Sequence, residues 1–182
     1  IVIDPLPTPT IIVTETSGVA NDDGIICTGD IASLGTVNTF SNYLWSTGAV
    51  TSTISVSTGG DYTVTVTDGN GCDGTATVTI TENPLPTPTV TVAETSGTNN
   101  NDGILCSGDA ATLDAGNYVS YIWSGGETTQ TISTSVAGDY TVTVTDTNGC
   151  DGTAMVTIVI DPLPTPTIIV TETSGVANDD GI

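Results

Sequence analysis

The 182-residue chain contains no lysine, no arginine and no histidine, whereas aspartate and glutamate together number 21, so its formal net charge is −21. Without cationic side chains a protein cannot displace counterions from nucleic-acid phosphates, and an anionic membrane surface repels it. We therefore expect no nucleic-acid partner and no direct insertion into a membrane. Self-formed Lys–Asn isopeptide cross-links are excluded by the same absence.

Most catalytic chemistry is also excluded by what the sequence lacks. A serine or cysteine nucleophile normally needs a nearby histidine or lysine base. A carboxylate pair is able to hydrolyse a glycoside, but the acidic residues here lie in Gly- and Asn-rich loops that recur along the chain. Aromatic residues that would line a pocket are few, with one Phe, two Trp and five Tyr. The sequence therefore predicts a protein that is not an enzyme and has no catalytic residues.

The residues that are present favour β-structure. Asp61–Thr67 and Thr75–Ile80 each alternate apolar side chains with threonines, and the intervening DGNG at 68–71 is a turn signal, so the two segments predict a hairpin. Further strands are expected at 8–15, 31–36, 42–46, 51–57, 87–94, 110–114, 120–124, 129–135, 139–146 and 153–160. Short strands with turns at regular spacing predict an all-β fold of antiparallel sandwiches.

The chain is periodic. Residues 1–25 and 158–182 are the same string, and PLPTP recurs at Pro5, Pro84 and Pro162, so one repeat unit is 78 or 79 residues long. We expect the chain to be a section of a longer array, and arrays of this kind usually serve mechanical or geometric purposes. The predicted division is 1–4, the end of a preceding repeat; 5–82 and 83–160, two sandwich domains; and 161–182, the start of a truncated third.

Proline-rich linkers join these units at residues 4–9, 83–88 and 161–166. Alternating prolines hold a backbone near polyproline II, which cannot continue a strand ladder and forms a short, stiff spacer. We expect a rod or a gently winding thread, because such spacers fix the angle between successive units.

Each unit contains two cysteines, Cys27 and Cys72 in the first and Cys106 and Cys150 in the second. They predict one disulfide within each unit and an oxidising, extracellular setting, since a thiolate metal site needs three or four convergent ligands. The alternative is a bond from Cys27 to Cys150, which would link the rod lengthwise. An extra short strand before Cys27 is expected to bring Cys27 and Cys72 to the same end of the sandwich.

Large aromatic side chains are expected in the sandwich cores. Trp45 and Trp123 each lie between the two cysteines of their unit, in strands flanked by apolar residues. Tyr62 and Tyr140 occupy apolar positions of alternating strands, so we expect them in the cores as well.

Loops rich in Asp and Asn offer oxygen ligands for calcium, which tolerates irregular loops. No cofactor is predicted other than calcium, and the same residues are typical of tight turns, which is the alternative interpretation. Our hypothesis is that calcium raises the unfolding temperature by relieving repulsion among the carboxylates. The candidate calcium ligands are Asp22, Asp23, Asp68, Asp73, Asp102, Asp146 and Asp151.

Several short motifs together resemble a known family. They are CTGD at 27–30, YLWSTG at 43–48, GDYTVTVTD at 60–68 and NGC at 70–72, with counterparts CSGD at 106–109, YIWS at 121–124 and NGC at 148–150. These motifs resemble immunoglobulin-like and PKD-like repeats of giant bacterial cell-surface adhesins. The turns after the tryptophans, STG at 46–48 and SGG at 124–126, depart from the FGDG of PKD repeats, which favours the looser immunoglobulin-like class.

The resemblance implies export to the bacterial cell surface and use in stalks or adhesive filaments. Our leading hypothesis is a structural segment of an extracellular filament or adhesin stalk, with self-association into filaments or contacts with neighbouring repeats. One alternative is a glycan- or surface-binding module using Tyr43, Tyr118 and Tyr121. Another is a spacer in a large secreted enzyme.

Overall fold

The computed structural model describes residues 4–169, and this part of the chain contains strands and no helix. The first seven strands form one sandwich and the next seven form another. The first comprises β1 (Ile11–Thr14), β2 (Ile25–Cys27), β3 (Ala32–Thr36), β4 (Asn42–Trp45), β5 (Thr53–Val56), β6 (Gly60–Thr67) and β7 (Asp73–Asn83). The second comprises β8 (Thr91–Ala93), β9 (Ile104–Cys106), β10 (Ala111–Asp114), β11 (Ser120–Trp123), β12 (Thr131–Thr134), β13 (Gly138–Thr145) and β14 (Asp151–Asp161).

Both sandwiches have the same topology. A three-stranded sheet, β1-β3-β5 or β8-β10-β12, packs on a four-stranded sheet, β2-β7-β6-β4 or β9-β14-β13-β11. Neighbouring strands are antiparallel except at β2–β7 and β9–β14, which are parallel. The predicted all-β sandwich fold is confirmed, and the short parallel strand is the element that the sequence left open.

The predicted hairpin is present with the predicted alternation. β6 and β7 pair from Gly60 with Ile80 to Thr67 with Asp73, and the turn at 68–72 closes them. Val64 and Val66 are fully buried, whereas the alternating Thr63, Thr65 and Thr67 are half-exposed. The period of two therefore separates a core face from an outer face, as expected for one buried side of a sheet.

Each sandwich has its own core around a tryptophan. Trp45 and Trp123 retain only 2% and 1% of their exposure, and each indole Nε1 donates a hydrogen bond of 2.9 Å, to the carbonyl oxygens of Thr51 and Thr129 respectively. The prediction that both rings fill cores is confirmed. Tyr62 is also a core residue, while Tyr140 is half-buried against the second core.

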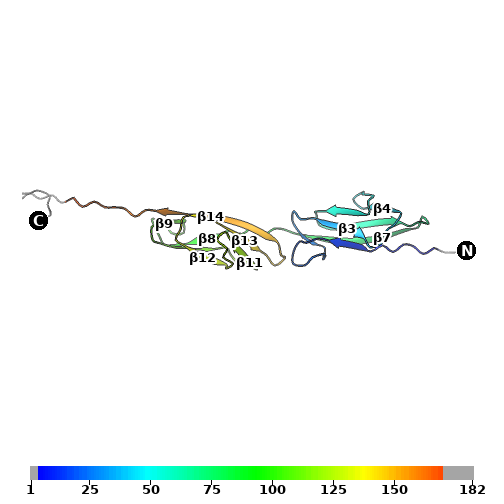
Figure 1. Cartoon of the computed structure of the whole chain (residues 1–182), viewed down its shortest axis with the longest axis horizontal. Helices are drawn as coiled ribbons and strands as arrows, with labels where there is room; N and C mark the ends of the chain where they lie inside the picture. Colours follow the sequence, from blue (N-terminus) through cyan, green and yellow to red (C-terminus); the bar gives the residue numbers. More distant parts are fainter. Residues whose placement is uncertain (1–3, 170–182) are drawn as a thin grey trace, which may run out of the picture.

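The two sandwiches lie end to end along the long axis of the molecule (Figure 1). Residues 84–90 connect β7 to β8, and this segment packs against the second sandwich: a Cβ atom on Gly152 would collide with the carbonyl group of Pro86. The equivalent Pro7 carbonyl lies in the same way against Gly74. The connection is thus in backbone contact with the sandwich that follows it.

Residues 1–3 and 170–182 lie outside the described residues, and so does most of the expected truncated repeat at 161–182. Its described residues 162–169 contain no strand.

Among the residues that the structure describes, no helix has the length and apolarity needed to cross a membrane.

The packing of the linker against glycine gives a test. Gly152→Ala is expected to cost about 1–3 kcal/mol of unfolding free energy, because the added methyl group meets backbone that cannot rotate away. Gly69→Ala is the control, since nothing lies within 4 Å of its Cβ position. Denaturant unfolding measures both variants, and equal stability of the two would contradict the contact.

Candidate functional site: the cysteine junction

The two cysteines of each unit lie at opposite ends of their sandwich. Cys27 ends β2 and pairs in register with Asn83, at the end of β7, whereas Cys72 immediately precedes the first residue of the same strand. The 11 residues of β7 span roughly 33 Å at about 3.3 Å per residue. A disulfide requires Cα atoms within about 7 Å, so Cys27 and Cys72 cannot pair within the unit.

The prediction of one disulfide within each unit is therefore wrong, and the reason is strand direction. The extra short strand before Cys27 does exist, but it runs parallel to β7 and so carries Cys27 to the far end of it. In the second unit β9 runs parallel to β14 and places Cys106 beside Asp161, while Cys150 precedes the start of β14.

The bond in the structure joins Cys27 of the first sandwich to Cys150 of the second. Their Cα atoms are 5.6 Å apart and 123 positions separate them in sequence. Both side chains are buried, whereas Cys72 and Cys106 are half-exposed free thiols. The alternative pairing from the sequence, lengthwise across the junction, is the one that the structure contains.

Backbone contact between two glycine turns accompanies the disulfide. Gly18 and Gly149 both have positive φ, at 75° and 77°. A Cβ atom on Gly149 would lie 2.5 Å from the carbonyl carbon of Gly18, and one on Gly18 would lie 3.2 Å from the carbonyl oxygen of Asn148. Glycine is needed here for the left-handed backbone and also for the close approach of the two sandwiches.

A buried polar network holds Cys27 in position. The carboxylate of Glu15, with 4% exposure, accepts hydrogen bonds from the backbone N–H groups of Ser17 at 2.6 Å and Asp23 at 3.0 Å. The hydroxyl of Ser17 donates to Asp30 at 2.6 Å and accepts from the N–H of Cys27 at 2.7 Å. Buried carboxylates satisfied in this way are strong structural anchors. We call the surface formed by residues 16–18, 27–28 and 30 the first socket.

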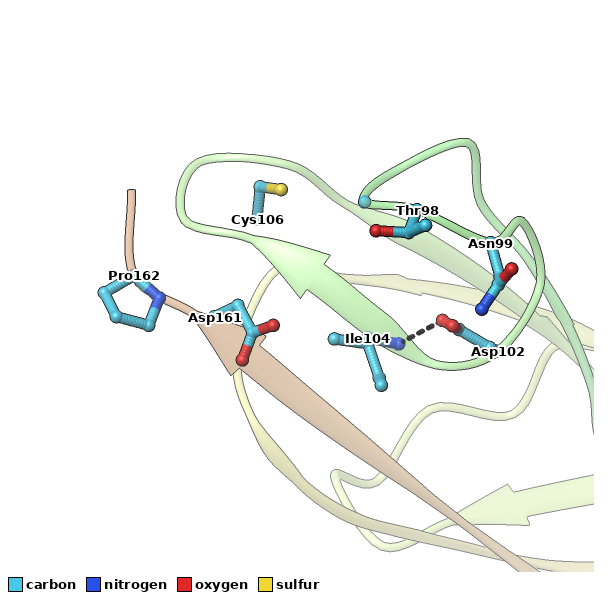
Figure 2. Close-up of a pocket in the computed structure, with 8 residues that line it drawn as sticks. Thr98, Asn99, Asp102, Ile104, Cys106, Asp161 and Pro162 are labelled. Atoms are coloured by element: carbon cyan, nitrogen blue, oxygen red, sulfur yellow. Dashed lines mark hydrogen bonds between the residues drawn. The ribbon is translucent and has the colours of Figure 1, made fainter. Parts of the chain in front are cut away.

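The second unit repeats this network around Cys106. Glu94 accepts from the N–H groups of Ser96 and Asp102, and the Ser96 hydroxyl donates to Asp109 and accepts from the N–H of Cys106 at 2.6 Å. Figure 2 shows Cys106 on β9 with its sulfur directed toward the loop that carries Thr98. We call this the second socket, lined by Gly97, Thr98, Asn99, Asp102, Ile104, Cys106, Asp161 and Pro162.

Sequence reasoning missed these networks. Glu15, Ser17, Glu94 and Ser96 are the buried polar residues among the described ones, and none of them was a candidate. The available signal was the string ETSG, which recurs at 15–18 and 94–97. A glutamate followed by threonine and serine suggests a surface strand end, so its burial follows only from the turn that folds back over it.

The first socket contacts a turn that contains Cys150, and the first sandwich has a similar turn around Cys72. In the turn at 146–151, the Asp146 carboxylate accepts from the N–H groups of Asn148 at 2.8 Å and Cys150 at 2.9 Å. In the turn at 68–73, Asp68 accepts from Asn70 and Cys72, both at 2.9 Å. We call these the two cysteine turns.

The free thiol of Cys72 lies in an unfavourable setting for ionisation. Desolvation by the surrounding residues and then the negative charges of Asp68, Asp4 and Asp73 raise its pKa above the ordinary value. Because the thiolate is the reactive form, Cys72 reacts more slowly at neutral pH than an unperturbed thiol.

The seven candidate calcium ligands lie in turns and at strand ends, where each carboxylate accepts a local hydrogen bond: Asp22, Asp23, Asp68, Asp73, Asp102, Asp146 and Asp151. Within residues 4–169 the one group of three metal-ligating side chains is Asp4, Asp68 and Cys72, with ligand atoms within 4.8 Å of one another. Of the seven candidates only Asp68 belongs to it, and a thiol is a poor calcium ligand. Calcium binding stays a prediction.

The tyrosines proposed for sugar binding are packed against the cores. Tyr121 is buried, and its hydroxyl donates to the carbonyl oxygen of Gly116 at 2.8 Å. Tyr43 and Tyr118 are half-buried and pack against the first and second cores respectively. None of the three forms the exposed aromatic platform that the glycan-binding alternative requires.

Comparisons with known proteins give weak likenesses. No family model matches the chain, and no curated protein matches it. Murine CEACAM1b is 14% identical with a TM-score of 0.34, covering 82% of this chain and 100% of that one. A 1.5-MDa bacterial ice-binding adhesin is 21% identical with a TM-score of 0.34, covering 87% of this chain and 67% of that one. SGBP-B of the Bacteroides ovatus mixed-linkage glucan utilization locus is 17% identical with a TM-score of 0.24, covering 80% and 45%. Likenesses at this level carry no conclusion about function.

The second socket depends on the charge of Glu94. Glu94→Gln is expected to destabilise the second sandwich by about 1–3 kcal/mol, because one carboxylate oxygen becomes an NH₂ group facing a backbone donor. Urea unfolding measures the loss. Glu127→Gln is the control, since Glu127 is exposed, and a similar loss in both variants would contradict the network.

Removing a carboxylate near Cys72 tests its electrostatics. Asp4→Asn is expected to speed alkylation of Cys72 at a fixed, mildly alkaline pH, because loss of a negative charge lowers the raised pKa and increases the thiolate fraction. Asparagine already occupies position 83, the counterpart of position 4, so the substitution introduces a residue that this linker position accepts. The gain should shrink in about 1 M salt, which screens interactions between exposed charges that are more than about 3 Å apart. An unchanged rate at low salt would contradict the assignment.

Proposed function

We propose that this chain is a non-catalytic structural segment of an extracellular bacterial filament or adhesin stalk, in which the sandwiches are locked end to end as a rod. The observation that supports this most is the position of the disulfide. Cys27–Cys150 crosses the junction between the sandwiches, where it controls their relative arrangement.

Neither sandwich contains a disulfide of its own. Each has a complete apolar core, and among the described residues no buried side-chain N or O atom lacks a hydrogen-bond partner. The bond is therefore placed where it joins units. On the chain-entropy model, closing a ring with a separation of 123 residues stabilises the folded chain by about 5 kcal/mol.

Two covalent connections cross the junction, the linker at 84–90 and the disulfide. A single connection would allow the sandwiches to rotate about it, whereas two separate connections with backbone contact at Gly18 and Gly149 restrict bending and twisting. Such a joint suits a spacer that must hold a distance. Disulfides persist outside the cell, which agrees with the proposed location.

The disulfide also determines how the chain carries tension. Force applied at the two ends passes from Cys27 directly to Cys150, so residues 28–149 form a ring that is outside the load path. Only the segments before Cys27 and after Cys150 are able to extend. The proposed function therefore predicts a thread that stretches little while the bond is intact.

Single-molecule pulling from the two ends tests this. The oxidised chain should release only short extensions, and a reductant should add roughly 440 Å of contour, at about 3.6 Å for each residue freed from the ring. The Cys27→Ser, Cys150→Ser double variant should show the full extension without reductant.

Small-angle scattering supplies the second readout. The oxidised chain should give one elongated particle, and the double variant a broader distribution of lengths. A broad distribution for the oxidised chain would contradict the rod, whatever the pulling data show.

A further inference from the structure

Each half of the cysteine junction occurs twice in the chain, but only one copy of each takes part in the Cys27–Cys150 junction. The first socket contacts the turn at 146–151. The second socket and the turn at 68–73 carry the two remaining cysteines, Cys106 and Cys72, as free thiols.

The second socket is built like the first. Ser96 accepts a hydrogen bond from the N–H of Cys106 and donates to Glu94 and Asp109, with nearly the same lengths as the equivalent bonds around Cys27. It encloses a hollow of about 340 Å³, into which Figure 2 shows the side chains of Cys106 and Thr98 projecting. Its form is therefore already that of a socket bound to a cysteine turn.

The glycine positions show which surfaces are covered. Gly149 lies against Gly18, but no atom comes within 4 Å of the Cβ position of Gly71, the counterpart of Gly149. Gly97, the counterpart of Gly18, has one atom in that range, the Ile104 carbonyl oxygen of β9 in its own sandwich at 3.6 Å. Gly71 nevertheless keeps the positive φ, 85°, that the contact uses.

The second socket and the first cysteine turn lie at opposite ends of the elongated molecule. Cys106 adjoins Asp161 at the exit of the second sandwich, whereas the side chain of Asn70, in the turn of Cys72, donates to Asp4 at the entrance of the first (Figure 1). Cys72 and Cys106 of one pair of sandwiches therefore cannot meet each other, but they face the right way to meet between two copies arranged head to tail.

We propose that the second socket binds the cysteine turn of a second copy of this two-sandwich unit, and that Cys106 of one copy forms a disulfide with Cys72 of the next. This rests on the proposed function and names its partner and site. The contact is heterologous, so each added copy again presents a socket at one end and a turn at the other. The product is an open, covalently linked thread.

The reaction needs an oxidant, and a small-molecule disulfide supplies it. The Cys106 thiolate attacks that disulfide, forms a mixed disulfide and releases one small thiol. The Cys72 thiolate of the second copy then attacks the Cys106 sulfur, forms the protein disulfide and releases the second small thiol. Two protein thiols lose two protons and two electrons, and the small disulfide gains them.

Two features oppose the reaction between separate copies. Each chain carries a net charge of −21, so encounter requires salt to screen the repulsion. Pro7 of the incoming copy already lies against its own Gly74, so residues 162–169 of the first copy must pass outside this contact. Docking of the turn has to overcome both costs. An excess of Cys106–Cys72 dimers over random pairing would therefore indicate a specific contact between the socket and the turn.

Mixing two single variants tests the proposal. Cys72→Ser keeps only the Cys106 thiol and Cys106→Ser keeps only the Cys72 thiol. The two are mixed, one isotope-labelled, with oxidised glutathione in high salt at mildly alkaline pH. The mixed dimer should exceed the like-with-like dimers by about tenfold, equivalent to about 1.4 kcal/mol of docking. Mass spectrometry should locate its bond between Cys106 and Cys72.

A variant that fills the socket separates docking from random collision. Thr98→Trp in the Cys72→Ser chain should return the products to the random distribution. Thr98→Val is the matched control and should keep the preference, because valine occupies the equivalent position 19, directly after the glycine of the first socket. Random proportions of dimers without the Thr98 change, or no dimer at all, would overturn the proposal. The pulling experiment on single oxidised chains is unaffected by this outcome.

Discussion

The parallel pairing of β2 with the end of β7 is the constraint on which the arrangement of the cysteines depends. Three residues, Ile25–Cys27, join the four-stranded sheet beside the last residues of its longest strand. This direction places Cys27 at the exit of the sandwich, next to the linker, while Cys72 stays at the entrance. An antiparallel strand would have turned the same cysteine toward Cys72. The choice between an internal and a connecting disulfide is therefore made by three hydrogen-bonded residue pairs.

The elements that follow a local rule were predictable. The alternation in Asp61–Thr67, the turn after it and the burial of Trp45 and Trp123 all follow from residue type and spacing. The direction of a three-residue strand does not, because so short a segment has no period and its partner lies more than fifty residues away. The buried networks of Glu15 and Glu94 were missed for a similar reason, since their donors come from turns that close only in the folded unit.

The buried carboxylates and the exposed ones have opposite effects in this acidic chain. Glu15 and Glu94 are neutralised in effect by backbone N–H groups, which is how a protein without a single lysine or arginine anchors a negative side chain. Around Cys72 the effect is different, because desolvation and then the charges of Asp68, Asp4 and Asp73 raise the pKa of the thiol. Negative charge therefore fixes the shape of the sockets and also slows the reaction of Cys72.

The absence of lysine and arginine has a further consequence for durability. Proteases that cleave after basic residues find no site anywhere in the chain. Enzymes of other specificity that cut between residues 28 and 149 would open the ring formed by Cys27–Cys150 without separating its ends, because the sulfur bridge still joins them. Separating the two ends of the chain within this ring therefore requires both a backbone cut and reduction of the disulfide.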